Sequence, residues 1–161
     1  MSKSQIGPWR FVLTYAIGGL TEIGFSSGED YILILSSSGR SVISLASREI
    51  IARDHEQPSY NADWIDLLQK AVRGIDILCD EWIQVVGLWG GSLNTHCSTG
   101  WSVNVRYEDQ TEFAYIAQKE SNIDVFIDKP ITEIRAFGFS NTGRFLVLAT
   151  GSDLSLYEYI K

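Results

Sequence analysis

The sequence contains few of the residues that build disulfide scaffolds or metal sites. Cys79 and Cys97 are its only cysteines among 161 residues, and it has two histidines. Two cysteines without a C-x-x-C spacing indicate neither a stapled secreted scaffold nor a zinc site. We therefore expect free thiols, no metal and no cofactor.

Long hydrophobic runs are also missing. The longest continuous apolar runs, such as 31–35, have the length of a strand, whereas a bilayer-spanning helix needs about 20 residues. The apolar stretch 9–20 is interrupted by Arg10, Thr14 and a pair of glycines, so it does not have the pattern of a signal peptide. We expect a cytoplasmic protein that does not bind membranes.

Positive charge is scarce as well. Lys and Arg number 13 against 20 Asp and Glu, which gives a net charge of −7. Residues 53–81 hold seven acids against three bases, and residues 108–128 hold six acids against Lys119 alone. Such segments repel phosphate backbones and attract basic proteins, so we expect a basic protein partner and no nucleic acid. Solvated charge that serves solubility alone remains an alternative.

What is abundant favours β-structure. Apolar residues make up 45% of the chain and aromatic residues 12%, values that suit one well-packed domain over residues 1–161. Short apolar or alternating runs separated by Gly- and Ser-rich turns recur along the chain. We expect an α+β, mainly β fold built from antiparallel meanders.

One β-unit occurs twice, at about 20–46 and about 131–160. In the first copy Leu20-Thr-Glu-Ile runs directly into Gly-Phe-Ser; in the second, Ile131-Thr-Glu-Ile reaches Gly-Phe-Ser through three inserted residues. A turn and an apolar strand follow in both copies. The spacing predicts two similar meanders at the two ends of the chain.

One segment has the spacing of an amphipathic helix, at about 61–74. Asp63 and Gly74 suit its two ends. Six apolar residues recur at the three- and four-residue spacing of one helix face: Trp64, Leu67, Leu68, Ala71, Val72 and Ile75. We therefore predict a helix that presents this apolar face to the core.

Aromatic residues are assigned by their context. We expect Trp64 and Trp82 in the core, and Trp101, Val103, Val105 and Tyr107 inward on an alternating strand. The polar loop between Trp89 and Trp101 has the glycines, small polar residues and flanking aromatics of a contact surface.

The second copy resembles the inner hairpin of a WD40-type propeller blade. The runs 139–144 (FSNTGR) and 149–153 (ATGSD) match the turns of that family's blade, which makes both repeats propeller-blade-like. Neither copy contains the Trp-Asp or Gly-His dipeptide of the family, and the copies start 111 residues apart, not the roughly 40–45 of a blade array. The resemblance therefore does not imply a closed propeller.

The whole chain is similar to a group of small bacterial proteins without an established activity. The shared features are Gly-Phe-Ser at 24–26, the glycine-rich run 87–93, Gly-Trp at 100–101 and the run 135–144. In size and acidity these proteins resemble immunity proteins of secreted-toxin systems. That likeness implies a non-enzymatic protein that neutralises a bacterial toxin by direct binding.

Two other functions stay open. A scaffold protein would assemble through its β-hairpins, and a small hydrolase or transferase would use Cys97 as nucleophile with His55 as base. For the binding function, the candidate residues are acidic or aromatic, with one histidine: Asp54, Glu56, Asp63, Asp66, Trp89, His96, Trp101, Glu108, Asp109 and Glu112. The oligomeric state is not indicated by the sequence.

Overall fold

The chain consists almost entirely of β-structure. We describe it from a computed structural model that covers residues 5–121, 124–130 and 132–160. Within these ranges the strands form four antiparallel sheets, with no α-helix of seven or more residues and no closed barrel or propeller. No helix in the described ranges is long and apolar enough to cross a membrane. The mainly β prediction is confirmed at this level.

The contacts within the chain divide it into two compact units. The terminal unit contains Met1–Ala16 and Leu93–Lys161, and the central unit contains Ile17–Ser92. Each unit has its own five-stranded sheet, three-stranded sheet and hydrophobic core. That residues 1–161 form a single domain stays a prediction.

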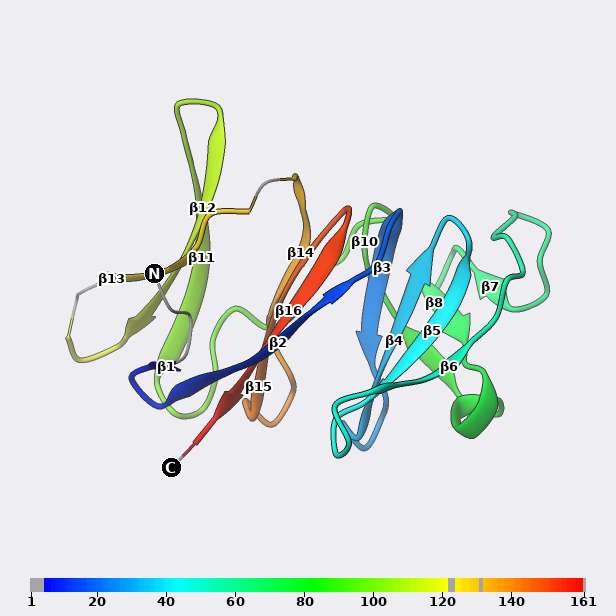
Figure 1. Cartoon of the computed structure of the whole chain (residues 1–161), viewed down its shortest axis with the longest axis horizontal. Helices are drawn as coiled ribbons and strands as arrows, with labels where there is room; N and C mark the ends of the chain where they lie inside the picture. The colour runs from blue at the N-terminus through cyan, green and yellow to red at the C-terminus, as the bar shows by residue number, and fades with distance from the viewer. Residues whose placement is uncertain (1–4, 122–123, 131, 161) are drawn as a thin grey trace. The chain divides into compact units, whose positions relative to one another are not determined.

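The terminal unit brings an early strand beside the last strand of the chain. Its strands are Gln5–Ile6 (β1), Trp9–Ala16 (β2), Trp101–Glu108 (β11), Thr111–Gln118 (β12), Asp124–Asp128 (β13), Ile134–Phe139 (β14), Phe145–Thr150 (β15) and Asp153–Tyr159 (β16). The five-stranded sheet has the order β1-β2-β16-β15-β14, and the second sheet has the order β11-β12-β13 (Figure 1). Because β2 pairs with β16, the N-terminal segment completes a sheet begun near the C-terminus.

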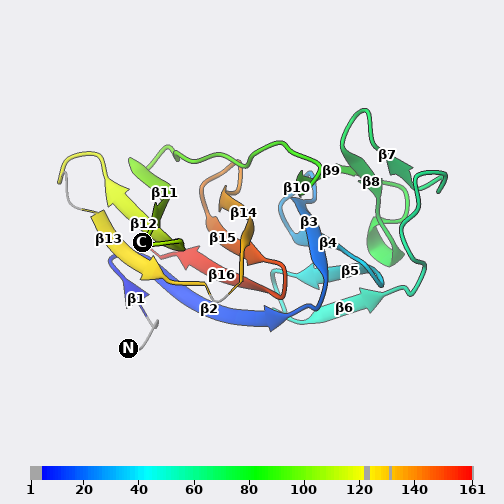
Figure 2. The same cartoon turned by 90° about the horizontal axis from the view of Figure 1, so that it is seen from above.

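The central unit repeats this combination of a large and a small sheet. Its elements are Leu20–Phe25 (β3), Tyr31–Ser36 (β4), Gly39–Ser44 (β5), Ile50–Arg53 (β6), Ile65–Asp66 (β7), Ala71–Arg73 (β8), the 3-10 turn Asp76–Leu78 (η1), Trp82–Gln84 (β9) and Val86–Gly87 (β10). The five-stranded sheet has the order β10-β3-β4-β5-β6, and the small sheet has the order β7-β8-β9 (Figure 2).

Two four-stranded stretches, one in each unit, share one strand register. β3, β4 and β5 correspond to β14, β15 and β16 at a constant spacing of 114 residues. The strands β6 and β2 complete the two repeats, and their ladders are irregular at the same place, after Val42 and after Leu156. The predicted repeats at about 20–46 and 131–160 are therefore matched meanders.

The alignment of the two repeats needs no insertion. The sequence comparison matched Leu20 with Ile131 and inserted three residues before the second Gly-Phe-Ser. The ladders instead place Leu20 opposite Ser36 and Ile134 opposite Thr150, so Ile134 is the counterpart of Leu20. Ile131 itself lies outside the described residues.

The same serine holds the first turn of each repeat. Ser26 Oγ accepts a hydrogen bond from the backbone N–H of Tyr31 at 3.1 Å, and Ser140 Oγ accepts one from Phe145 at 3.1 Å. Both serines are buried. A side-chain oxygen that accepts a nearby backbone N–H stabilises a turn, so the repeated Gly-Phe-Ser motif encodes the same turn twice.

The two repeats turn opposite faces toward the small sheet of their own unit. In the central unit Leu33 packs in a cluster with Trp64. In the terminal unit Leu148 packs in a cluster with Ile116. The counterpart of Leu33 is Val147, which points to the other face because neighbouring strand residues alternate. The two meanders therefore have the same backbone register but pack their small sheets against opposite faces.

A buried arginine joins the two sheets of the central unit. Arg40 in β5 is 6% exposed, and its Nε and Nη2 atoms each lie 2.7 Å from Asp54 Oδ2. Its Nη1 donates to the carbonyl oxygen of Arg73 in β8 at 2.7 Å, and its guanidinium lies 4.0 Å from the centre of the Trp64 ring. Since β5 and β8 belong to different sheets, this one side chain connects them.

We expect Arg40→Met to lower the free energy of unfolding by about 3 kcal/mol, because the partly buried Asp54 carboxylate and the Arg73 carbonyl oxygen both lose their donor. Urea denaturation measures this loss. Arg53→Met, on the exposed side of β6, is the matched control and should cost about 0.5 kcal/mol or less. Equal losses in the two variants would contradict the connecting role of Arg40.

The Glu158 carboxylate in β16 lies between two arginines. Its Oε2 is 2.9 Å from Arg10 Nη2, and its Oε1 is 3.3 Å from Arg144 Nη2. Burial raises the pKa of Glu158, but the hydrogen bonds and charges of Arg10 and Arg144 together outweigh burial and hold the pKa below its usual value. Folding therefore favours the ionised carboxylate. The resulting stability is present above the usual Glu pKa and is lost as the pH falls through the lowered one.

Glu158→Gln should therefore destabilise the protein at pH 7 by no more than about 1 kcal/mol, because both arginines are partly exposed. The difference from the wild type should shrink as the pH falls below about 4.3, the usual Glu pKa. Urea denaturation at pH 7, 5, 4 and 3 gives this difference, with the exposed Glu120→Gln as control. A difference that stays constant down to pH 3 would exclude the ion pairs as its source.

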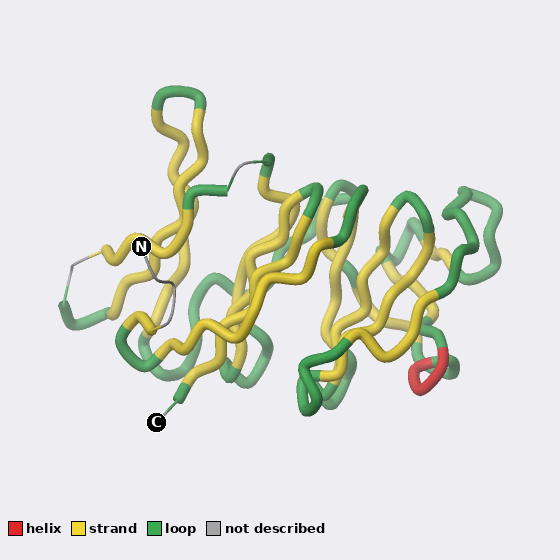
Figure 3. Tube along the Cα trace, viewed as in Figure 1, coloured by secondary structure: helices red, strands yellow, loops and turns green. Residues whose placement is uncertain are grey.

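The helix predicted over about 61–74 is wrong. This segment forms the antiparallel strands β7 and β8 and the turn between them, and Figure 3 shows only strand and loop there. Lys70 has a φ of 51°, outside the helical region, and Asp66 Oδ1 accepts the N–H of Gln69 at 3.0 Å within the turn. Leu68, predicted on the apolar face, is 89% exposed. In the hairpin Trp64, Ala71 and Val72 are buried, whereas Leu67 and Leu68 lie in the exposed turn.

The predictions for the aromatic residues divide. Trp64 is 1% exposed, as expected, but Trp82 in β9 is 47% exposed, so its assignment to the core is wrong. On β11, Trp101 and Val103 are buried as predicted, whereas Tyr107 is 71% exposed. Tyr107 lies near the turn of the β11–β12 hairpin and pairs with Glu112, outside the part of β12 that pairs with β13.

Candidate functional site

The predicted partner-binding residues divide between the two units. The central unit contains Asp54, Glu56, Asp63, Asp66 and Trp89. The terminal unit contains His96, Trp101, Glu108, Asp109 and Glu112.

The acids of the central unit differ in how far they are free to meet a partner. The Asp54 carboxylate is held by Arg40, and Asp66 closes the β7–β8 turn. The side chain of Glu56 is 63% exposed and lies 3.7 Å from Arg40 Nη2. The side chain of Asp63 is 86% exposed and lies 3.9 Å from Arg73 Nη2. Glu56 and Asp63 are thus the acids best placed for a partner.

In the terminal unit three acids lie at or beside the β11–β12 turn. Glu108 is exposed, and Asp109 occupies the turn with a φ of 48°. Glu112 Oε1 accepts the backbone N–H of Ile134 at 3.0 Å. Glu112 and Tyr107 line a polar cavity of about 510 Å³ beside this turn. The structure brings these acids together, but one of them already has an internal partner.

The other two candidates of the terminal unit are not equally accessible. Trp101 is 8% exposed and packs in the hydrophobic core, so its ring offers little surface to a partner. His96 is exposed, and its Nδ1 lies 3.1 Å from Thr95 Oγ1.

Negative charge is concentrated in the central unit. Ile17–Ser92 holds eleven acidic and five basic residues, a net charge of −6. The terminal unit holds nine acidic and eight basic residues, a net charge of −1. The overall charge of −7 therefore belongs almost wholly to one unit, and that unit will attract a basic partner more strongly.

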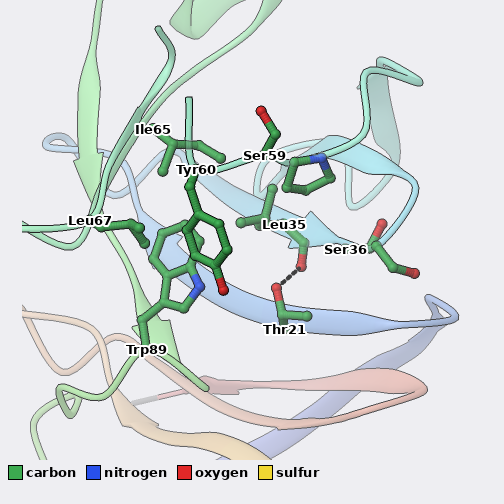
Figure 4. A pocket seen from close by; sticks show the side chains of 10 residues that line it. Thr21, Leu35, Ser36, Ser59, Tyr60, Ile65, Leu67 and Trp89 are labelled. Carbon is green, nitrogen blue, oxygen red and sulfur yellow. Dashed lines mark hydrogen bonds between the residues drawn. The ribbon is translucent and has the colours of Figure 1, made fainter. Parts of the chain in front are cut away.

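Trp89 lines a pocket of the central unit that has a volume of about 290 Å³. The rings of Tyr60 and Trp89 and the side chain of Leu67 point into the same space, with Leu35 and Thr21 on its opposite side (Figure 4). Thr21 Oγ1 donates to the Leu35 carbonyl oxygen at 3.3 Å. We call this the Trp89 pocket.

A buried carboxylate positions Trp89. Glu22 in β3 is fully buried, and its Oε1 accepts the backbone N–H of Trp89 at 2.5 Å. The carbonyl oxygen of the neighbouring Thr21 accepts the N–H of Leu88 at 3.1 Å. These two bonds fasten the loop after β10 to β3. Glu22 Oε2 has no hydrogen-bond partner among the described residues.

The predicted catalytic pair of Cys97 and His55 is divided between the two units. Cys97 Sγ lies 3.1 Å from Thr99 Oγ1, and His55 belongs to the other unit. A Cys97–His55 pair therefore stays a prediction. In the described ranges, no group of three or more His, Cys, Asp and Glu side chains is arranged to hold a metal ion. The expectations that the protein has no metal and no cofactor stay predictions.

The sequence analysis missed most of the residues around the Trp89 pocket. Tyr60 is 86% exposed, Leu68 is 89% exposed and Leu88 is 58% exposed. Leu67 and Leu68 were assigned to a helix face, and Glu22 lay inside a repeat motif. Tyr60, two residues after the breaker Pro58, is the one that the sequence could have indicated as an exposed loop aromatic.

We expect Glu22→Ala to accelerate hydrogen exchange at the Trp89 amide by about tenfold or more, because that N–H loses its acceptor. Glu22→Gln retains an oxygen acceptor and should change the rate much less. Residue-resolved exchange followed by NMR measures both variants, and the Leu88 amide, whose acceptor is the Thr21 carbonyl, is the internal reference. An unchanged Trp89 rate in Glu22→Ala would show that Glu22 does not hold the loop.

Neither protein-family models nor curated proteins give a match to this chain. The sequence resemblances to a propeller blade and to small bacterial proteins stay predictions.

Proposed function

We propose that this chain is a non-enzymatic binding protein that neutralises a basic protein partner, as an immunity protein does to a bacterial toxin in the cytoplasm. The observation that carries the proposal is the net charge of −6 in the central unit against −1 in the terminal unit. Localised charge of one sign steers an oppositely charged partner and suppresses wrong ones.

Two features of the central unit support this function. Its most exposed candidate carboxylates, Glu56 and Asp63, lie on the loop that leads from β6 to β7. The same loop contributes Tyr60 to the Trp89 pocket, so charge and apolar surface occur together. Charged groups around an apolar centre are the usual composition of a protein interface.

The repeated meanders serve as a scaffold in this proposal. Their matched register supports the propeller-blade-like interpretation of both repeats. Sheets hold their connecting loops in fixed positions, and binding residues commonly lie on such loops. Self-assembly through the β-hairpins remains the alternative, and light scattering distinguishes it by the mass of the particle.

The partner can be sought with the tagged full chain as bait in a lysate of its host, washed at low and at high salt. The proposal predicts one stoichiometric basic protein that is lost at high salt. Expressed alone, that protein should stop growth, and co-expression of this chain should restore it. A captured protein that is acidic, or whose toxicity this chain does not relieve, would contradict the immunity function.

With that partner, Glu56→Lys combined with Asp63→Lys should weaken binding by about tenfold or more and reduce its salt dependence, since rim charges act mainly on association. The matched control is Glu108→Lys combined with Glu120→Lys, the same charge change on exposed acids of the terminal unit. Isothermal titration at two salt concentrations measures both pairs. Equal effects of the two pairs would show that net charge matters and the central unit does not.

A further inference from the structure

The Trp89 pocket has the size of a site for a side chain. Its volume of about 290 Å³ lies just below the roughly 300–1,000 Å³ of small-molecule sites. Protein interfaces commonly place one bulky anchor in such a pocket, surrounded by contacts that exclude water.

The lining of the pocket suits an apolar group. Leu35, Ile65 and Leu67 supply aliphatic surface, and Tyr60 and Trp89 supply rings. No charged side chain belongs to the lining. A cation inside the pocket would therefore lose its hydration without gaining a carboxylate, which is unfavourable.

The surroundings of the pocket carry negative charge. Residues 54–70, which supply half of the lining, contain four acids against Lys70 alone, a net charge of −3. Within this segment Glu56 and Asp63 are well exposed. Cations that flank an apolar anchor would reach these carboxylates while the anchor enters the pocket.

Two exposed apolar side chains are sequence neighbours of residues that line the pocket. Leu68 is 89% exposed and follows Leu67 of the lining, and Leu88 is 58% exposed and precedes Trp89. Clustered exposed apolar residues mark interaction surfaces more often than single ones do.

We propose that the Trp89 pocket takes one bulky aliphatic side chain from a short protein segment in which lysines or arginines flank that residue. The proposal rests on the proposed function, because it specifies how a basic partner is recognised. Its occupant follows from two independent properties, the uncharged lining and the acidic segment that supplies half of it.

The first experiment uses three capped pentapeptides on the full chain, followed by 1H–15N NMR. They are Lys-Lys-Leu-Lys-Lys, the same peptide with a central glycine, and Glu-Glu-Leu-Glu-Glu. The leucine peptide with lysines should shift the Trp89 indole signal, and the signal of the exposed Trp82 is the internal control. The glycine peptide should bind at least about tenfold more weakly, because burial of a leucine side chain contributes that much. The acidic peptide should not bind.

Equal binding of the leucine and glycine peptides would overturn the proposal that an aliphatic side chain enters the pocket. Electrostatic attraction to the central unit would still hold. Failure of all three peptides to shift Trp89 would overturn the proposal too. The second experiment uses the captured partner with Trp89→Ala and the matched control Trp82→Ala. A loss of about tenfold or more in Trp89→Ala alone supports the pocket.

A second pocket variant, Ser59→Phe, adds bulk at the pocket lining without removing a ring. It should also weaken binding, which separates blocking of the pocket from local unfolding in Trp89→Ala. A partner that binds both pocket variants like the wild type would overturn this inference and leave the proposed function intact. If no basic partner is captured, the proposed function fails, whatever the peptides show.

Discussion

The central unit depends on the buried guanidinium of Arg40. It donates hydrogen bonds to Asp54, just after β6, and to the Arg73 carbonyl in β8, and it stacks over the Trp64 ring. A buried cation must have such partners, because the loss of its hydration is otherwise uncompensated. The segment between Asp54 and Trp64 is thereby fixed at both ends. Its exposed acids and Tyr60 can be presented in a defined position only because of that constraint.

The two repeats show how one backbone pattern serves two environments. The register, the irregularities and the first turn agree at a spacing of 114 residues. The faces that contact the small sheets differ, and so does the charge of the units that contain them. The backbone repeat is set by the serine-held turns and by strand pairing. The binding function that we propose comes instead from residues 54–70 and from the loop at Leu88 and Trp89, which lie outside the repeat. This explains why a repeat motif alone indicates so little about function.

Many strands and turns could be predicted from the sequence, because the residues that specify them are close together in the chain. The serine of each Gly-Phe-Ser motif and the apolar runs of β4 and β15 specify turns and strands within a few residues. The pairing of β2 with β16 could not be foreseen, since it joins segments more than a hundred residues apart. The false helix has a physical origin too: the apolar spacing from Trp64 to Ile75 has the period of a helix, but Leu67 and Leu68 lie in the turn between β7 and β8, and β8 is held by Arg40 and β9.

The candidate site was predicted only in part. Acidic residues are recognisable in any sequence, so Glu56 and Asp63 were found. Asp54 and Trp101 were found as well, but burial and internal partners give them structural roles. Glu22 was missed because a buried carboxylate that accepts a single backbone N–H has no sequence signature. Tyr60, Leu67 and Leu68 become a surface only when the β7–β8 hairpin is folded.

The most direct test is a hydrogen-exchange footprint of the full chain with its captured partner bound. The account predicts that slowed exchange is concentrated in residues 54–70 and in the loop at Leu88 and Trp89. Protection centred instead on the β11–β12 turn near Glu108, or protection spread evenly over both units, would contradict binding through the central unit.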